Sequence, residues 1–240
     1  MKKALIVGGS NGIGLAIALQ LSDYDSVCII DKVPPSMNLP THISFESFDL
    51  TSPDYGIFDH HQDVSLLMIT AGFGQLAHFQ DVSEQHIIDS FQVNTVAAIR
   101  IVKHFYKRLL GPDDFFCGIM VSIAGFMSSP LFAVYGATKA ALKVFIESIN
   151  VELEMSGSPN RILNVSPGSI KGTNFNGGGN NLNLTTELAK QIIGHLKTKN
   201  DLFIPQYEEV YREVLQRYHN DFRAEGKHSY EYKLKSGRMK

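Results

Sequence analysis

Several features are scarce in this chain of 240 residues, and each scarcity excludes a class of protein. No apolar run approaches the roughly 20 residues that a membrane-spanning helix requires. Only residues 4–7 form an apolar stretch between the N-terminal lysines and the first glycine pair, which is too short for the core of a signal peptide. We therefore expect a cytoplasmic protein without a membrane partner.

Cysteine is equally scarce. Cys28 and Cys117 both lie in apolar segments typical of buried strands, so we expect two buried thiols and no disulfide framework. His60 and His61 are the only clustered histidines, and no set of Cys, His or carboxylate residues shows the spacing of a metal site. The sequence therefore predicts no metal centre.

Neither sign of charge is in excess. The chain has 22 Lys and Arg against 24 Asp and Glu, a formal net charge of −2. This balance gives no general attraction to nucleic acid or to an anionic membrane. The apolar fraction of 44% is typical of a globular protein, and no low-complexity linker divides the chain. We therefore expect a single globular domain without a nucleic-acid partner.

Apolar strand-like segments alternate with helical patterns along the chain. This alternation predicts an α/β fold, a Rossmann-like doubly wound parallel sheet of about seven strands in one domain. Residues 1–205 would form the dinucleotide-binding and catalytic domain, with residues 206–240 attached as a helix and a basic tail. The longest helical patterns cover residues 83–110 and 134–155. The predicted strands are residues 3–7, 26–30, 43–48, 65–70, 115–122, 161–165 and 202–204.

A glycine-rich turn joins the first strand to the first helical pattern, as a dinucleotide-binding fingerprint requires. In Gly8-Gly9-Ser10-Asn11-Gly12-Ile13-Gly14, Gly8 permits the tight turn and Gly12 lets the backbone approach a pyrophosphate. Gly14 lets the helix pack close to the strand. The N-terminus of the helix offers free N–H groups and a positive dipole end to the phosphates.

An acid stands at the tip of the second strand. Asp31 follows Gly14 by 17 residues and can accept hydrogen bonds from the adenosine ribose, while its charge would repel the 2′-phosphate of NADP. Lys32 comes next, and its cation could attract that phosphate instead. We favour NAD as the cofactor on the ribose argument, with NADP as the alternative.

Tyr135 and Lys139 lie four residues apart in a helical pattern, and Ser122 precedes the tyrosine by 13 residues. Residues i and i+4 share one face of a helix. A neighbouring ammonium favours the phenolate and lowers the pKa of a tyrosine from its usual value of about 10. Tyr135 could then exchange a proton with an alcohol or carbonyl oxygen that Ser122 holds. Such a pair alone also occurs in ordinary helices, so the prediction depends on the glycine turn.

Together these motifs resemble the short-chain dehydrogenase/reductase family in its single-domain form. The resemblance runs from Ala4 to about Ile204, with Val7 where the family's glycine motif begins with threonine. It implies a catalytic tetrad of Asn94, Ser122, Tyr135 and Lys139. Asn94 would hold a water linked to the lysine, although its amide could instead serve a helix–helix hydrogen bond.

The resemblance also implies contacts to the cofactor. The pair Asp49-Leu50 would contact adenine, although Asp49 could instead cap the turn after it, and Lys139 would bind the nicotinamide ribose. Pro167, Gly168 and Ile170 would border the nicotinamide. The full predicted set is Gly8, Ser10, Asn11, Gly12, Ile13, Gly14, Asp31, Asp49, Leu50, Ala71, Gly72, Tyr135, Lys139, Pro167, Gly168 and Ile170.

The implied function is that of an oxidoreductase which transfers a hydride between NAD(P) and an alcohol or carbonyl substrate. The alternative is a regulatory or sensor protein of the same fold that binds NAD(P) without significant turnover. Members of the family usually pair through two long helices, here residues 83–110 and 134–155. We therefore expect a homodimer or a homotetramer.

Three segments depart from the family pattern. Thr70 replaces an asparagine that ties neighbouring strands together, and only about fifteen residues separate Asp49 from the fourth strand, so the helix there is shortened or absent. A helical pattern covers residues 207–218. Residues 223–240 hold six Lys or Arg against two Glu. This segment is either a solvated, partly disordered tail or a structure that folds over an active site and binds an anionic substrate group.

Overall fold

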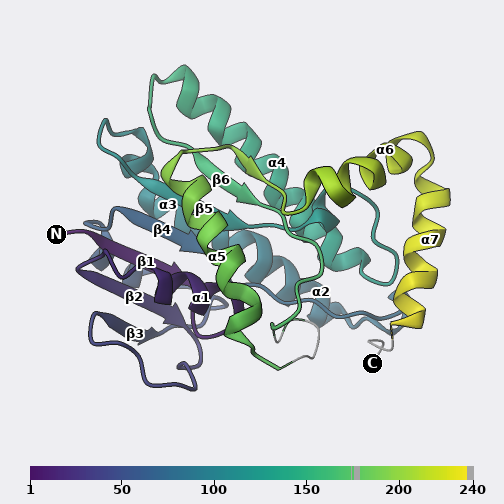
Figure 1. The fold of residues 1–240 in the computed structure, drawn as a ribbon, viewed down its shortest axis with the longest axis horizontal. Helices are drawn as coiled ribbons and strands as arrows, with labels where there is room; N and C mark the ends of the chain where they lie inside the picture. Colours follow the sequence, from purple (N-terminus) through teal and green to yellow (C-terminus); the bar gives the residue numbers. More distant parts are fainter. Residues whose placement is uncertain (174, 176–178, 237–240) are drawn as a thin grey trace.

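Seven parallel strands form one sheet in the computed structural model, which describes residues 1–173, 175 and 179–236. The spatial order is β3-β2-β1-β4-β5-β6-β7, so the chain reverses its direction of travel between β1 and β4. The predicted doubly wound α/β fold is confirmed (Figure 1). The strands are β1 (Lys3–Val7), β2 (Ser26–Asp31), β3 (Ile43–Ser47), β4 (Leu66–Ile69), β5 (Phe116–Met120), β6 (Ile162–Val165) and β7 (Leu202–Phe203).

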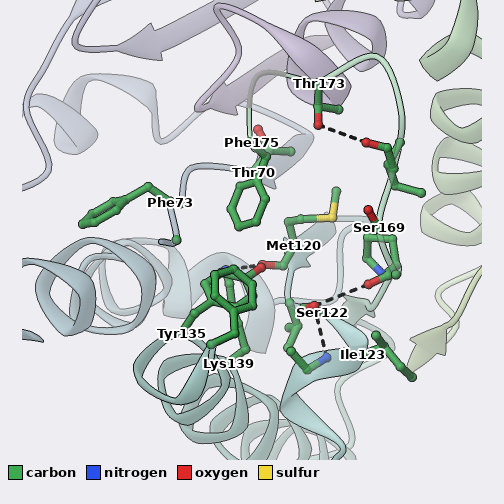
Figure 2. Close-up of a pocket in the computed structure, with 18 of the residues that line it drawn as sticks. Thr70, Phe73, Met120, Ser122, Ile123, Tyr135, Lys139, Ser169, Thr173 and Phe175 are labelled. Atoms are coloured by element: carbon green, nitrogen blue, oxygen red, sulfur yellow. Dashed lines mark hydrogen bonds between the residues drawn. The ribbon is translucent and has the colours of Figure 1, made fainter. Parts of the chain in front are cut away.

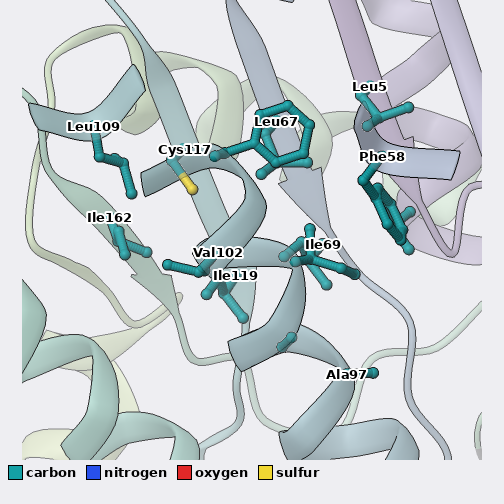
Figure 3. Close-up of a cluster of buried hydrophobic side chains, with 14 of the residues drawn as sticks. Leu5, Phe58, Leu67, Ile69, Ala97, Val102, Leu109, Cys117, Ile119 and Ile162 are labelled. Atoms are coloured by element: carbon teal, nitrogen blue, oxygen red, sulfur yellow. The ribbon is translucent and has the colours of Figure 1, made fainter. Parts of the chain in front are cut away.

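Helices cover both faces of the sheet, because the central strands are apolar on both sides. Side chains alternate along β1, where Ala4 and Ile6 face α1 (Gly12–Gln20) and α5 (Leu182–Lys197). Leu5 and Val7 face the opposite layer, which includes α3 (Ala97–Leu110) and α4 (Ala133–Met155). The second core surrounds Phe105 and Phe115, whose stacked rings lie 5.9 Å apart (Figure 3 shows neighbouring side chains of this core).

The predicted long helix over residues 83–110 is interrupted. It begins with α2 (Glu84–Phe91), whose N-cap Ser83 accepts a hydrogen bond from the amide of His86, and continues as α3. Between them, η3 (Gln92–Val96) is a π-helical turn, and such turns are frequent at functional sites. The predicted asparagine of the tetrad, Asn94, lies within this turn.

Two connections match the departures noted in the sequence. A 3-10 helix, η1 (Gly56–His61), takes the place of the usual crossover helix between β3 and β4, as predicted. The hydroxyl of Thr70 donates to the carbonyl oxygens of Val7 at 3.1 Å and Gly8 at 2.9 Å. This threonine therefore joins the end of β4 to the end of β1, the task expected of the missing asparagine.

The C-terminal segment forms a helical hairpin at the side of the domain (Figure 1, yellow-green and yellow). The helix predicted over residues 207–218 is present as the π-helical turn η6 (Tyr207–Tyr211) followed by α6 (Arg212–Asn220). Asp221 then caps α7 (Phe222–Lys235) by accepting hydrogen bonds from the amides of Arg223 and Ala224. The interpretation of this segment as a disordered tail is wrong for α7, while residues 237–240 lie outside the described residues.

Helix α5 was not predicted from the sequence, because the glycine- and asparagine-rich stretch before it is typical of a loop. Within the described ranges, no helix combines the length and the apolar character that crossing a bilayer requires.

Candidate active site

A cleft of about 1190 Å³ opens at the carboxyl ends of the central strands. In open parallel sheets, ligands bind at this edge, where the strand order reverses. The cleft runs from the glycine turn after β1, past Ser122 after β5, to the C-terminal hairpin. Every predicted site residue lines it except Ser10 and Asn94, which lie just behind its surface.

The glycine turn is pressed against the end of β4. Gly8 adopts a φ of +84°, and a Cβ atom there would lie 2.3 Å from the amide nitrogen of Ala71. A Cβ atom at Gly14 would lie 2.4 Å from the carbonyl oxygen of Gly8. Larger residues are therefore excluded from both positions, and the backbone of the turn borders the cleft directly.

Two polar groups of the turn, the Ser10 hydroxyl and the Gly12 amide, could bind a ligand. Among the described residues, the buried hydroxyl of Ser10 has no hydrogen-bond partner. The amide of Gly12, at the start of α1, donates to the side-chain oxygen of Asn180 at 2.9 Å. A phosphate oxygen could accept from both groups, since helix N-termini favour anions. The residues present therefore fit a nicotinamide dinucleotide.

Asp31 and Asp49, the acids predicted to contact the adenosine, both line the cleft. The Asp31 carboxylate accepts a hydrogen bond from the amide of Ser10 at 3.1 Å, so it also holds the glycine turn in place. Asp49 accepts from the amide and hydroxyl of Thr51, both at 2.9 Å, and these bonds hold the pKa of Asp49 below its usual value. The turn-capping role considered for Asp49 is thus present, although its side chain still lines the cleft.

Ser122, Tyr135 and Lys139 come together in the middle of the cleft (Figure 2). Ser122 directly follows β5, and its hydroxyl accepts a hydrogen bond from the amide of Ala124 at 3.1 Å. Tyr135 stacks on Phe132 with 4.3 Å between ring centroids, and the Nζ atom of Lys139 lies 5.6 Å from the Tyr135 ring centroid. The predicted i, i+4 pair therefore shares the cleft-facing side of α4.

Burial, rather than a neighbouring charge, controls the pKa values of this pair. Tyr135 is 8% exposed, and burial raises its pKa above the usual value, while its hydrogen bond with Ser122 opposes that shift. Lys139 is 2% exposed, and burial lowers its pKa to about 7. The predicted lowering of the Tyr135 pKa is wrong for this structure, because burial disfavours both the phenolate and the ammonium that was expected to stabilise it.

Asn94, in the turn η3, forms hydrogen bonds both to the loop after β4 and to α4. Its amide accepts from the backbone N–H of Phe73 at 2.9 Å, and donates to the carbonyl of Phe73 at 2.8 Å and the hydroxyl of Thr138 at 3.2 Å. The helix–helix alternative is therefore present in the bond to Thr138. Lys139 is fixed by donation to the carbonyl of Met120 at 2.9 Å.

A sequence profile described as short chain dehydrogenase matches residues 2–181, three quarters of the chain. This chain belongs to the short-chain dehydrogenase/reductase family. An uncharacterised oxidoreductase of Staphylococcus epidermidis is 25% identical over 193 residues, which covers 72% of this chain and 82% of that protein. The match supports the assignment of this short-chain dehydrogenase as an oxidoreductase.

Solved structures share the fold of this short-chain dehydrogenase over most of its length. A short-chain dehydrogenase from Streptomyces avermitilis gives a TM-score of 0.76 at 21% identity, covering 98% of this chain and all of its own. Another, from Burkholderia cenocepacia in complex with NADP, gives 0.78 at 17% identity, covering 95% and 99%. At these identities the likeness shows the fold alone.

The C-terminal hairpin of this short-chain dehydrogenase supplies a wall of the cleft, which agrees with the second interpretation of residues 223–240 as a structure that folds over the site. A Cβ atom at Gly168 would lie 1.6 Å from the hydroxyl oxygen of Tyr211, so the turn η6, which precedes α6, approaches closely only because residue 168 is glycine. Phe175 adds a ring 5.1 Å from that of Tyr135. The tyrosines and basic residues of residues 223–240 were the sequence signal for a role of this segment at the cleft. A local pattern does not show the packing that brings them there.

A cluster of ligand-type side chains lies away from the cleft. The Cys28 thiol donates to a carboxylate oxygen of Glu46 at 3.4 Å, and His61 lies 3.3 Å from the other oxygen. Burial and the Glu46 charge raise the pKa of Cys28 to about 12, which disfavours the thiolate that binds metals. Contacts to the Glu46 carboxylate account for the close approach of these three side chains without a metal ion. The expected lack of a metal centre stays a prediction.

The buried lysine makes a prediction for stability. Lys139 binds a proton more weakly in the folded chain than in the unfolded chain, so unfolding takes up a proton between pH 7 and about 10.5. The free energy of unfolding, relative to Lys139→Met, should therefore rise with pH in this window, by up to about 1.4 kcal/mol per pH unit. Urea unfolding at pH 7, 8 and 9 measures it, with the exposed Lys190→Met as control. Parallel pH profiles of wild type and Lys139→Met would contradict the burial argument.

Proposed function

We propose that this protein transfers a hydride between a nicotinamide cofactor and an alcohol or carbonyl substrate, with Tyr135 as the acid/base. The observation that supports the proposal is the convergence of Ser122, Tyr135 and Lys139 on the same cleft as the glycine turn. A proton-exchanging group, an oxygen anchor and a dinucleotide cradle are the three elements that this reaction needs.

Each residue of the tetrad has a separate task in this proposal. The Ser122 hydroxyl holds the substrate oxygen beside the Tyr135 hydroxyl. Lys139 positions the nicotinamide ribose, and Asn94 keeps the loop after β4 attached to α4, which supports a proton path to the lysine. The bound nicotinamide accepts or supplies the hydride. The remaining predicted cofactor residues hold the dinucleotide along the cleft.

At neutral pH the Tyr135 hydroxyl is in the protonated form that carbonyl reduction uses. Because burial raises the pKa of Tyr135, the phenol is protonated and ready to donate to a developing alkoxide. Alcohol oxidation requires the Tyr135 phenolate instead, and the positive charge of an oxidised nicotinamide held in the cleft would favour that form. Tyr135 would then take the proton of the alcohol.

The tyrosine hydroxyl can be tested directly. Tyr135→Phe should lower hydride transfer on a panel of ketones and alcohols by at least about a hundredfold, the range that general acid catalysis contributes. Tyr106→Phe, which removes a hydroxyl from outside the cleft, should retain activity. Initial rates followed by cofactor absorbance give the comparison.

Two results would contradict the proposal. Unchanged activity of Tyr135→Phe would remove Tyr135 as the acid/base. Cofactor binding without turnover on any member of the panel would instead favour the sensor alternative.

For the cofactor we propose NAD, since the Asp31 carboxylate stands where the adenosine ribose would lie. The solved relative with NADP bound does not support this preference, so it needs its own test. Asp31→Asn removes the charge but keeps an acceptor for the Ser10 amide. The variant should narrow the ratio of the Kd for NADP to the Kd for NAD about tenfold or more, as the loss of one charge repulsion predicts.

Lys32→Gln is the matched variant, because Lys32 lines the same end of the cleft. Lys32→Gln should leave the Kd for NAD unchanged and raise the Kd for NADP. If wild-type protein binds NADP more tightly than NAD, the ribose argument is wrong and Lys32 determines the preference. Fluorescence titration of the reduced cofactors measures both ratios.

We also propose that two or four copies pair through α3 and α4. Val144, Val151 and Met155 form an exposed apolar stripe on α4, at spacings of 7 and 4 residues that place them on one face. Val144→Lys with Val151→Lys should therefore lower the mass in sedimentation equilibrium to that of a monomer. Leu184→Lys, at an equally exposed position on α5, should not. A monomeric wild type would contradict the proposal.

A further inference from the structure

Tyr211 lines the cleft and has no task in the function proposed above. It is the last residue of the π-helical turn η6, and π-helical turns are frequent at functional sites. The turn begins after Gln206, a residue other than glycine whose φ is +58°. Such a left-handed conformation is costly for a residue with a side chain, and functional sites are where this cost is often found. Two irregularities of the backbone therefore precede Tyr211 directly.

The tip of the Tyr211 ring touches the segment that borders the predicted nicotinamide site. A Cβ atom at Gly168 would lie 1.6 Å from the hydroxyl oxygen of Tyr211 and 2.6 Å from its Cζ atom. The oxygen is the nearer of the two atoms, so the ring points its hydroxyl at Gly168. Any side chain at position 168 would displace this hydroxyl.

This hydroxyl is close in the chain to a contact of the proposed oxygen anchor. Gly168 follows Pro167, whose carbonyl accepts a long hydrogen bond from the Ser122 hydroxyl at 3.4 Å. The groups that meet the Pro167-Gly168 pair are therefore Ser122 from the end of β5 and Tyr211 from the C-terminal hairpin. Both line the same cleft.

The Tyr211 hydroxyl does not hold the fold together. Among the described residues, the structure shows no hydrogen bond of this hydroxyl. Tyr211 is only partly exposed, and a polar group that is removed from water without a partner lowers stability. A phenylalanine would pack the same ring without this cost. The hydroxyl is therefore suited to a partner that enters the cleft.

Tyr211 would act as a hydrogen-bond donor. Burial raises the pKa of Tyr211 above its usual value, and the neighbouring Tyr232 raises it further. The hydroxyl therefore keeps its proton at neutral pH. A protonated phenol has one donor and also accepts, so it can donate to an oxygen of a ligand while it accepts from a neighbour.

The hairpin that carries Tyr211 is fastened through both of its helices. The Nε atom of Arg217 on α6 donates to the buried carboxylate of Glu225 on α7 at 2.8 Å. Lys233 on α7 donates to the hydroxyl of Ser129 at 2.6 Å, in the connection that leads to α4. The position of the Tyr211 hydroxyl is thus set before a ligand arrives, which lowers the entropy cost of binding.

The aromatic side of the cleft differs from the side that Tyr211 supplies. Tyr135 stacks on Phe132 at 4.3 Å between ring centroids, and the ring of Phe175 lies 5.1 Å from that of Tyr135. The two phenylalanine rings offer packing and no hydrogen-bond donor. A substrate whose reacting oxygen lies at Tyr135 therefore meets apolar rings on one side and the Tyr211 hydroxyl on the other.

We propose that Tyr211 is a specificity-determining residue, which donates a hydrogen bond to a second oxygen of the substrate, apart from the oxygen that reacts. The inference rests on the function proposed above, since it identifies the substrate class of the same site. The substrates are then ketones or alcohols that carry a further acceptor oxygen. A site built to hydrogen-bond such a group discriminates against analogues that lack it.

The test measures the binding of matched ketones that differ by one oxygen. The probes are 2-, 3- and 4-methoxycyclohexanone, and each is compared with the ethylcyclohexanone of the same ring position, which has CH2 in place of the ether oxygen. The full chain is saturated with NAD or NADP, because an oxidised cofactor cannot reduce a ketone and no probe is consumed. Ligand-detected NMR titration gives the Kd of each probe.

At least one methoxy ketone should bind about fivefold more tightly than its ethyl counterpart, as one net hydrogen bond predicts. The ring position with the largest ratio reports how far the second oxygen lies from the reacting carbon. Tyr211→Phe should bring this ratio to about one and leave the Kd of the ethyl ketone unchanged. Tyr207→Phe is the matched control, since Tyr207 belongs to the same turn and does not line the cleft.

Two further measurements separate recognition from a structural role. Tyr211→Phe should keep the melting temperature of wild type, because the hydroxyl forms no hydrogen bond within the described residues. Gly168→Ala should lower the binding ratio as Tyr211→Phe does, since its Cβ atom takes the place of the hydroxyl. The double variant should lose no more than either single variant, because both remove the same contact.

Equal affinity within every methoxy and ethyl pair, including no measurable binding of any probe, would overturn the inference. A ratio that survives in Tyr211→Phe, or that Tyr207→Phe lowers as much, would overturn it too. These outcomes concern binding to the complex with oxidised cofactor. A failure of hydride transfer in the kinetic comparison of Tyr135→Phe with wild type is a separate result, and it rejects the proposed reaction instead.

Discussion

The contact between the glycine turn and the end of β4 is the constraint on which the site depends. Gly8 lies so close to the backbone of Ala71 that no side chain fits, and Thr70 bonds the carbonyl oxygens of Val7 and Gly8. This contact lies where the strand order reverses, at the end of the ladder between β1 and β4, so it joins the two halves of the sheet at the edge of the cleft. One half of the sheet carries the glycine turn and the other carries Ser122, and their separation decides whether the proposed cofactor site and the proposed catalytic residues can act on one molecule.

The burial of Tyr135 and Lys139 has consequences for their pKa values that charge pairing alone does not predict. Tyr135 and Lys139 both lose contact with water, and each is thereby driven toward its neutral form. Because the lysine is anchored to the carbonyl of Met120, it is a fixed group whose charge responds to its surroundings. A bound, charged nicotinamide would therefore change the proton affinities of the pair more than it would in an exposed site, since the effective dielectric is low.

The chain's local patterns were informative where structure depends on neighbours in sequence. The apolar strands, the glycine turn and the i, i+4 pair of Tyr135 and Lys139 were all found from short segments, because strand and helix periodicities are local. The π-helical turn that holds Asn94 was missed, because a helical pattern does not reveal a change in hydrogen-bond register. Helix α5 and helix α7 were missed because their neighbouring glycine, asparagine and basic residues resemble those of loops and tails.

The sequence by itself determined the doubly wound sheet and the kind of chemistry, since these follow from residue types and their spacing. Only the tertiary structure decided which side chains face one another across the cleft. Glycine at position 168 lets Tyr211 approach, the pair Arg217 and Glu225 joins α6 to α7, and Lys233 is thereby brought beside Ser129. These contacts join residues separated by up to 104 positions, and such separations are closed by packing rather than by any local preference of the chain.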